Sequence, residues 1–128
     1  MARILIIDDS GFTRRQLKRV LNHLHHEVME AASGAEGLVA LESFRPDCVV
    51  TDLLMPEMDG FGFIAAVRQR EDDLRSVPIV VLSADVQETS KTRTVELGAD
   101  GFMNKPVKPE HVRLMLAEMM NRAPELDS

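Results

Sequence analysis

Short runs of β-branched and other apolar residues alternate with longer stretches of helical pattern, and this alternation constrains the fold more than any other feature of the chain. It is typical of βαβ units, in which parallel strands form a sheet that helices cover on both faces. The stretch 27–31 is more polar than the other runs, so we expect it at an edge of the sheet. The sequence predicts an α/β fold, a doubly wound sheet of five parallel strands with five helices. The predicted strands are Ile4–Ile7, Glu27–Ala31, Cys48–Val50, Ile79–Leu82 and Gly101–Met103.

The predicted helices differ in how many apolar residues would hold them to the sheet. One helix is expected to begin near Gly34, because Ser33 and Glu36 have the spacing of a capping box. The helix predicted over 86–97 is mostly polar and has few apolar anchors, so we expect it to be loosely held. Apolar residues recur at amphipathic-helix spacing in the first and last helices, at Leu17, Val20, Leu21 and Leu24 and at Val112, Met115, Leu116 and Met119.

Polar side chains follow four of the predicted strands, at the point where each strand ends. They are Asp8 and Asp9 after the first strand, Asp52 after the third, Ser83 after the fourth and Lys105 after the fifth. Ligands of open α/β sheets bind in the crevice at the carboxyl ends of the strands, so we expect these side chains to converge on one site. A single aspartate at such a position is more often a turn or a helix cap. The prediction therefore depends on the combination.

The chemistry of these side chains suits a phosphoryl group and a cation. At an effective dielectric constant near 20, close carboxylates repel one another by about 4 kcal/mol per pair. Oxygen ligands in a solvated crevice favour Mg²⁺, which keeps several waters and bridges to phosphate oxygens. Lys105 adds a positive charge and Ser83 a hydroxyl donor, and both can stabilise a phosphoryl group. No residue in this set resembles a general base for attack on a small substrate.

The composition limits the other classes of function. The 128 residues suit one domain, and the formal net charge of −6 argues against direct binding of nucleic acid. The lone Cys48 lies in an apolar run, which excludes a disulfide framework and predicts a buried side chain. Neither a signal peptide nor a membrane-spanning segment is recognisable, so we expect a cytoplasmic protein without membrane insertion. A basic run with the spacing of a solvated helix face consists of Arg14, Arg15, Lys18 and Arg19.

From about Ile4 to Met120 the chain resembles the receiver domain of bacterial two-component response regulators, including the single-domain chemotaxis type. Four motifs carry the resemblance: Ile-Ile-Asp-Asp-Ser at 6–10, Thr-Asp-Leu-Leu-Met-Pro-Glu-Met-Asp-Gly at 51–60, Val-Leu-Ser-Ala at 81–84 and Lys-Pro at 105–106. The resemblance implies a flavodoxin-like sheet with strand order 2-1-3-4-5. It also implies a receiver domain over 1–123, followed by a short C-terminal tail at 124–128.

The resemblance implies a role for each carboxylate. Asp52 would be the nucleophile that accepts the phosphoryl group as an acyl phosphate. Asp8, Asp9 and Asp52 would hold Mg²⁺, and the backbone carbonyl of Leu54 would complete the protein ligands.

The resemblance also implies the parts of a switch. Ser83 would bond to a phosphoryl oxygen, and Lys105 would pair with the phosphoryl group. Phe102 matches an aromatic position whose ring turns inward when Ser83 moves. The bond between Lys105 and Pro106 would be cis, an isomer that costs little before proline.

Partners follow from the same resemblance. A sensor histidine kinase or a phosphotransfer protein would supply the phosphoryl group, and the switched form would regulate an unknown downstream protein. The chain would be no enzyme for outside substrates and would catalyse only its own phosphoryl transfer and dephosphorylation. Output would run through the helix over 86–97, the strand at 101–103 and the last helix, around Lys91, Arg93, Phe102 and Lys108.

Two residues beside the expected phosphate depart from the commonest receiver pattern. Leu54, two residues after Asp52, is apolar where receivers often carry a polar residue, and Asp85 lies two residues after Ser83. Our hypothesis is that both positions influence the lifetime of the phosphoryl group. Leu54 would hinder water and lengthen that lifetime, and Phe102 would pack inward more readily than a tyrosine.

Two other functions compete with the receiver interpretation. An aspartyl phosphotransferase or phosphatase could use a similar sheet, but it would need a second acid near Asp52 and a cap over the substrate. A receiver-like module that no longer takes phosphate would be expected to lack Asp9, Asp52 or Lys105, and all three are present. Both a stand-alone regulator and an excised domain are compatible with the sequence.

Overall fold

The computed structural model describes residues 1–85 and 87–122. The tail predicted at 124–128 lies outside these residues, and so does the first residue of the helix predicted over 86–97. No helix in the described part of the chain is long and apolar enough to cross a membrane.

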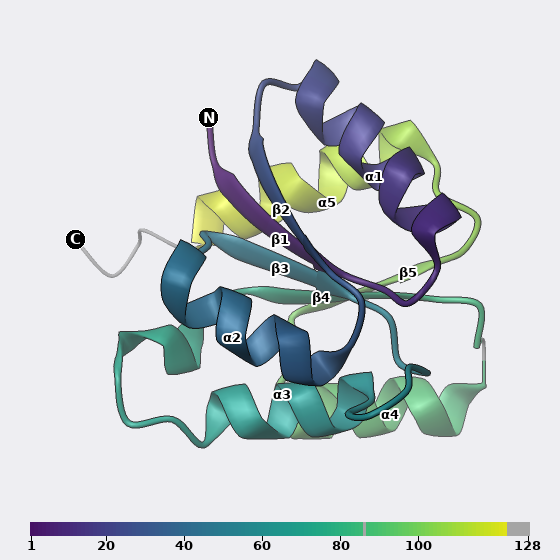
Figure 1. The fold of residues 1–128 in the computed structure, drawn as a ribbon. Helices are drawn as coiled ribbons and strands as arrows, with labels where there is room; N and C mark the ends of the chain where they lie inside the picture. The colour runs from purple at the N-terminus through teal and green to yellow at the C-terminus, as the bar shows by residue number, and fades with distance from the viewer. Residues whose placement is uncertain (86, 123–128) are drawn as a thin grey trace.

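The five strands form one parallel sheet with the order β2-β1-β3-β4-β5, which confirms the prediction (Figure 1). β1 lies between β2 and β3, so the strand order reverses there. The polar strand β2 is at an edge, as expected, and Glu27 and Glu30 on it are exposed. The strands are β1 (Arg3–Ile7), β2 (Glu27–Ala31), β3 (Cys48–Thr51), β4 (Ile79–Ser83) and β5 (Gly101–Asn104).

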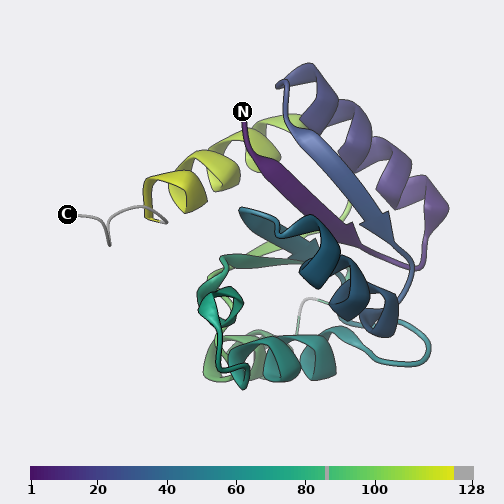
Figure 2. The same cartoon turned by 60° about the vertical axis from the view of Figure 1, so that its left-hand side comes forward.

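The helices cover both faces of the sheet. α1 and α5 lie on one face, and α2, α3 and α4 lie on the other (Figures 1 and 2). The short 3₁₀ helix before β4 was not predicted. The elements are α1 (Gly11–His23), α2 (Gly34–Phe44), α3 (Gly60–Arg68), η1 (Asp73–Ser76), α4 (Glu88–Leu97) and α5 (Pro109–Arg122).

Alternate side chains of the central strands fill two separate cores, because successive strand residues point to opposite faces. Leu5, Ile7 and Val49 pack with α2 and α3. Ile4 and Cys48 pack with α1 and α5 on the other face. Cys48 is fully buried, as predicted, and burial raises the pKa of its thiol to about 12. It therefore acts as a small apolar side chain.

The N-terminus of α2 is capped as the sequence predicts, with one difference. Ser33 Oγ accepts a hydrogen bond from the Glu36 N–H at 3.1 Å. The Glu36 carboxylate accepts from the N–H of Ala32, at 2.9 Å, and not from that of the cap residue. The two bonds still satisfy two N–H groups that have no partner inside the helix.

α4 has little buried surface of its own, as expected. Thr94 is its only buried residue. The helix begins at Glu88, and its N-cap Gln87 makes no side-chain capping bond. Its C-terminal end is held more firmly than predicted, because Arg68 of α3 donates a hydrogen bond to the Gly98 carbonyl at 2.9 Å.

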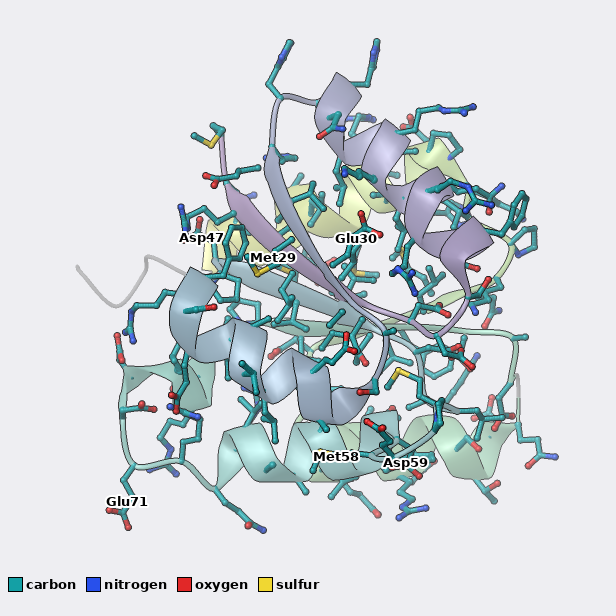
Figure 3. The ribbon with its side chains drawn as sticks, viewed as in Figure 1. Met29, Glu30, Asp47, Met58, Asp59 and Glu71 are labelled. Atoms are coloured by element: carbon teal, nitrogen blue, oxygen red, sulfur yellow. The ribbon has the colours of Figure 1, made fainter. Side chains whose placement is uncertain are left out.

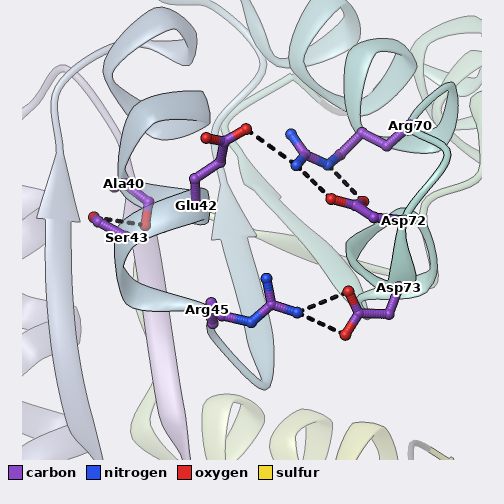
Figure 4. Close-up of polar contacts among 7 residues, drawn as sticks. All are labelled: Ala40, Glu42, Ser43, Arg45, Arg70, Asp72 and Asp73. Carbon is purple, nitrogen blue, oxygen red and sulfur yellow. Dashed lines mark hydrogen bonds and ion pairs between the residues drawn. The ribbon is translucent and has the colours of Figure 1, made fainter.

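Exposed ion pairs connect the end of α2 to the segment around η1 (Figure 4). Arg45 pairs with Asp73, and Arg70 pairs with both Glu42 and Asp72. These residues precede β3 and β4, so they lie at the amino edge of the sheet. Exposed pairs of this kind contribute little to stability and are screened by salt.

Candidate functional site

Three carboxylates meet at the carboxyl edge of the sheet. One oxygen from each of Asp8, Asp9 and Asp52 lies within 4.8 Å of the others. Asp8 and Asp52 are buried, whereas Asp9 is exposed, so solvent reaches the cluster beside Asp9. The predicted convergence of these residues is confirmed.

Lys105 brings a positive charge to the same cluster. Its Nζ lies 2.9 Å from Asp52 Oδ2 and 3.0 Å from Asp8 Oδ2. The Lys105 N–H donates to the carbonyl of Ser83, and the Lys105–Pro106 bond is cis, as predicted. Burial would lower the pKa of Lys105, but its bonds to Asp52 and Asp8 outweigh that effect and raise the pKa above its ordinary value. The side chain is therefore charged at neutral pH.

Hydrogen bonds and close packing fix Asp52. Its N–H donates to the Ile7 carbonyl at 2.9 Å, and its Oδ1 accepts from the Leu53 N–H at 2.7 Å. Its own carbonyl accepts from the Thr51 hydroxyl at 2.9 Å. A Cβ at Gly60 would overlap this carbonyl oxygen, so the start of α3 can approach the end of β3 only with glycine there.

Asp8 is held by its backbone and its side chain. The Asp8 N–H donates to the Ala31 carbonyl at 3.1 Å, and Asp8 Oδ1 accepts from the Ser10 N–H at 2.9 Å. Burial raises the pKa of Asp8, and the bonds from Ser10 and Lys105 offset only part of the increase. The charged form of Asp8 is thus less favourable in the fold than in water.

The donor set of the cluster fits a hard divalent cation. The three carboxylates bring only oxygen ligands, and with Lys105 their formal charge is −2 when all are ionised. Asp8, Asp9 and Asp52 are the residues that would hold the cation, and the exposed side leaves room for water ligands. The ligand role predicted for the Leu54 carbonyl stays a prediction. The Leu54 side chain is 66% exposed.

Ser83 is connected to the start of α4 through Asp85. Ser83 is buried, and its Oγ accepts from the Asp85 N–H at 3.1 Å. The Asp85 carboxylate accepts from the Ser90 hydroxyl at 2.6 Å and from the Gln87 N–H at 3.0 Å. These two bonds hold the pKa of Asp85 below its ordinary value. The carboxylate is therefore engaged by α4, and its predicted effect on phosphate lifetime stays a prediction.

Aromatic rings organise the basic side chains of the predicted output surface. Lys91 Nζ lies 5.4 Å from the centroid of the Phe102 ring, and the Arg93 guanidinium lies 4.0 Å from that of Phe61. Phe102 is partly buried. A hollow of about 360 Å³ beside it is lined by Phe102, Lys105, Lys108, His111, Leu114 and Met115, among others.

Three residues of the basic run are exposed, as expected for a solvated helix face, but Arg14 is partly buried. Its Nη1 donates to the Asp8 carbonyl at 2.6 Å, and its Nε donates to Glu30 at 3.0 Å. Lys18 also pairs with Glu30, whereas the other two arginines of the run are exposed. The partial burial of Arg14 could have been predicted from the sequence spacing. Arg14 lies three residues before the buried Leu17 and so borders the apolar face of α1.

Comparison with known protein sequences places this geometry in a family. Residues 4–117 match the model of the response regulator receiver domain. The chain is 33% identical over 126 residues to the probable transcriptional regulator ycf27 of Porphyridium aerugineum, covering 98% of this chain and 51% of that protein. It is 34% identical over 119 residues to the transcriptional regulatory protein SrrA of Staphylococcus aureus, covering 93% and 48%. The chain therefore spans about half the length of these curated relatives.

Solved structures agree with the sequence match. The chemotaxis response regulator CheY4 of Vibrio cholerae aligns with a TM-score of 0.86 and 33% identity, over 93% of this chain and 98% of that one. A complex of CheX, CheY, BeF3 and Mg²⁺ from Borrelia burgdorferi gives a TM-score of 0.84 and 25% identity, over 92% and 88%. The chain therefore belongs to the response regulator receiver domain family, whose general function is phosphorylation-dependent signalling.

Proposed function

We propose that Asp52 accepts a phosphoryl group from the phosphohistidine of a sensor kinase or a phosphotransfer protein. The observation that carries this proposal is the buried Asp52 carboxylate at the end of β3, with Lys105 Nζ 2.9 Å from one of its oxygens. In the transfer, a bond forms between an Asp52 oxygen and phosphorus while the phosphorus–nitrogen bond breaks. The imidazole nitrogen keeps the electron pair of the broken bond, and the product is an acyl phosphate.

Mg²⁺ is the cation that we propose for the cluster of Asp8, Asp9 and Asp52. Oxygen-only ligands and an open side for water favour it, and the Leu54 carbonyl would be a further ligand. When bound, Mg²⁺ neutralises negative charge on the phosphoryl oxygens. The similar complex from Borrelia burgdorferi contains Mg²⁺ together with BeF3, which supports this choice.

Lys105 and Ser83 would act on the transferred group. Lys105 Nζ already lies beside an Asp52 oxygen, so a small movement would place it on a phosphoryl oxygen. The Ser83 oxygen accepts a bond from Asp85, which leaves the hydroxyl hydrogen available for a phosphoryl oxygen. None of these residues suits the role of general base for an outside substrate. The chain would therefore catalyse only its own phosphorylation and dephosphorylation.

The output surface that we propose is formed by α4, β5 and α5. Phe102 and Lys91 meet there, and the adjacent hollow includes Leu114, which is 53% exposed for a large apolar residue. An exposed apolar side chain in a hollow lined mainly by polar and charged residues suits a protein partner. The net charge of −6 argues against direct contact of these residues with nucleic acid.

Mass measurement after incubation with Mg²⁺ and acetyl phosphate tests the proposal. The wild type should gain one phosphoryl group and Asp52→Asn none, whereas Asp73→Asn, an exposed aspartate at the other edge of the sheet, should behave like the wild type. A gain of one phosphoryl group by Asp52→Asn would refute the assignment. Turnover of a small phosphomonoester would favour the aspartyl phosphatase instead.

A further inference from the structure

Arg14 connects the metal-ligand cluster to the edge of the sheet. Its Nη1 donates to the backbone carbonyl of Asp8 at 2.6 Å, and its Nε donates to Glu30 Oε1 on β2 at 3.0 Å. Glu30 Oε2 lies 3.3 Å from Lys18 Nζ. The Arg14 side chain is 22% exposed, so much of it is shielded from water.

The bond to the Asp8 carbonyl has a geometric consequence for Asp9. The carbonyl of Asp8 and the N–H of Asp9 belong to one planar peptide group. Arg14 therefore fixes the orientation of the peptide that joins two residues of the cation cluster. The Asp8 N–H is held by the Ala31 carbonyl at 3.1 Å, so the backbone is restrained on both sides of Asp8.

Glu30 keeps the guanidinium of Arg14 in place. Figure 3 shows Glu30 on β2, on the side toward α1. Burial would raise the pKa of Glu30, but hydrogen bonds from Arg14 and Lys18 outweigh it and lower the pKa. Glu30 is therefore charged at neutral pH. The guanidinium of Arg14 can donate to a charged carboxylate on one side and to a backbone carbonyl on the other because its donors form a planar fork. Lysine lacks this fork.

We propose that Arg14 is a positioning residue for the divalent-cation site, acting through the Asp8–Asp9 peptide group. This inference rests on the proposed function, in which the carboxylate cluster binds Mg²⁺. Two effects of Arg14 on the cation have opposite signs. Its positive charge repels a cation, so its removal would strengthen Mg²⁺ binding, whereas loss of its bond to Asp8 would weaken binding because the ligands lose their orientation.

Arg15 is the matched control for separating these effects. It is the next residue of α1 and carries the same charge, but it is exposed. Among residues 1–85 and 87–122 the structure shows no hydrogen bond or ion pair for it. Arg14→Ala and Arg15→Ala thus make the same change in net charge, and only Arg14→Ala removes the bond to the Asp8 carbonyl.

Calorimetric titration with Mg²⁺ of the wild type and the two variants tests the inference. We expect Arg14→Ala to weaken Mg²⁺ binding about 10-fold, as is typical for partners of metal ligands. Arg15→Ala should bind Mg²⁺ as tightly as the wild type or slightly more tightly. Glu30→Gln should also weaken Mg²⁺ binding. The double variant of Arg14→Ala and Glu30→Gln should bind Mg²⁺ only slightly less tightly than Arg14→Ala alone. Arg14→Lys, which keeps the charge without the fork, should also bind less tightly than Arg15→Ala.

The titration separates failure of this inference from failure of the proposed function. Equal Mg²⁺ affinity in Arg14→Ala and Arg15→Ala, or tighter binding by Arg14→Ala, would overturn the positioning role while leaving the metal site intact. A wild type that binds no Mg²⁺ would overturn the metal assignment and this inference with it. If Arg14→Ala does not fold by circular dichroism, Glu30→Gln decides, and wild-type affinity in that variant overturns the inference.

Discussion

Replacing Asp8 with asparagine tests the charge balance of the carboxylate cluster. At an effective dielectric constant of about 20, Lys105 Nζ at 3.0 Å attracts the ionised Asp8 side chain by about 5.5 kcal/mol. Asp9 and Asp52, with oxygens within 4.8 Å, each repel it by about 3.5 kcal/mol. Together the two repulsions exceed the attraction by about 1.5 kcal/mol, and the cost of burying the charge adds to this penalty.

Without a divalent cation, we expect Asp8→Asn to raise the free energy of unfolding by about 1–2 kcal/mol at neutral pH. Asparagine retains an oxygen that can accept from the Ser10 N–H, so this bond survives. The folded pKa of Asp8 is raised, mainly by burial, so the wild type carries the full penalty above that pKa. As the pH falls through the raised pKa toward the ordinary 3.8, the penalty disappears and the advantage of Asp8→Asn should shrink.

Mg²⁺ should reverse the ranking of the two proteins. At 100 times its Kd, a ligand that binds only the folded state stabilises it by about 2.7 kcal/mol. The wild type should show this gain, whereas Asp8→Asn, which lacks one ligand, should gain little. Urea unfolding in chelator and in Mg²⁺ measures both effects, with Asp73→Asn as the exposed control. Lower stability of Asp8→Asn in chelator, with no change in pH dependence, would refute the reasoning.

Three further predictions concern the neighbours of the site. Leu54→Asn should shorten the lifetime of the phosphorylated protein several-fold, because an amide can orient water where a 66% exposed apolar side chain cannot; an unchanged decay by mass measurement would contradict this. Gly60→Ala should lower the free energy of unfolding by about 1–3 kcal/mol through overpacking, and wild-type stability in urea would count against it. Ser90→Ala should speed hydrogen exchange in the first turn of α4, because it removes the 2.6 Å bond to Asp85. Thr92→Ala, an exposed change in the same helix, should leave the exchange rate unchanged. Equal exchange rates in Ser90→Ala and the wild type would argue against a capping role.

The sequence was sufficient to predict the site because its parts are set by topology. Asp8, Asp52 and Lys105 follow strands whose carboxyl ends must lie at one edge of any parallel sheet of this order. Their convergence does not depend on the details of packing. The edge position of β2 was predictable for a related reason, because Glu27 and Glu30 would be costly in a strand buried on both faces.

Contacts set by the approach of a helix to the sheet were not predictable in the same way. The bond from Arg14 to the Asp8 carbonyl depends on how closely α1 lies beside the end of β1. Arg68 reaches the Gly98 carbonyl only because α3 and α4 are neighbours in space. The direction of the Asp85 carboxylate likewise depends on where α4 begins, since its partners are the N-cap residue Gln87 and Ser90 of the first turn. Sequence spacing alone does not fix these distances.

The contacts of α4 indicate which of its ends would respond to the proposed phosphorylation of Asp52. Its C-terminal end is fixed by the bond from Arg68 to the Gly98 carbonyl, whereas its N-terminal end depends on Asp85, whose N–H is bonded to Ser83. A hydrogen bond from Ser83 to a charged phosphoryl oxygen is worth about 1.5–3 kcal/mol, and shifting a population from 1:99 to 99:1 takes about 5.5 kcal/mol. Ser83 alone would therefore give a partial switch, and Lys105, the cation or a bound partner would have to supply the rest. If the proposed bond to the phosphoryl group draws Ser83 Oγ away from the Asp85 N–H, that N–H loses its acceptor, and the first turn of α4 should move while its Gly98 end stays in place.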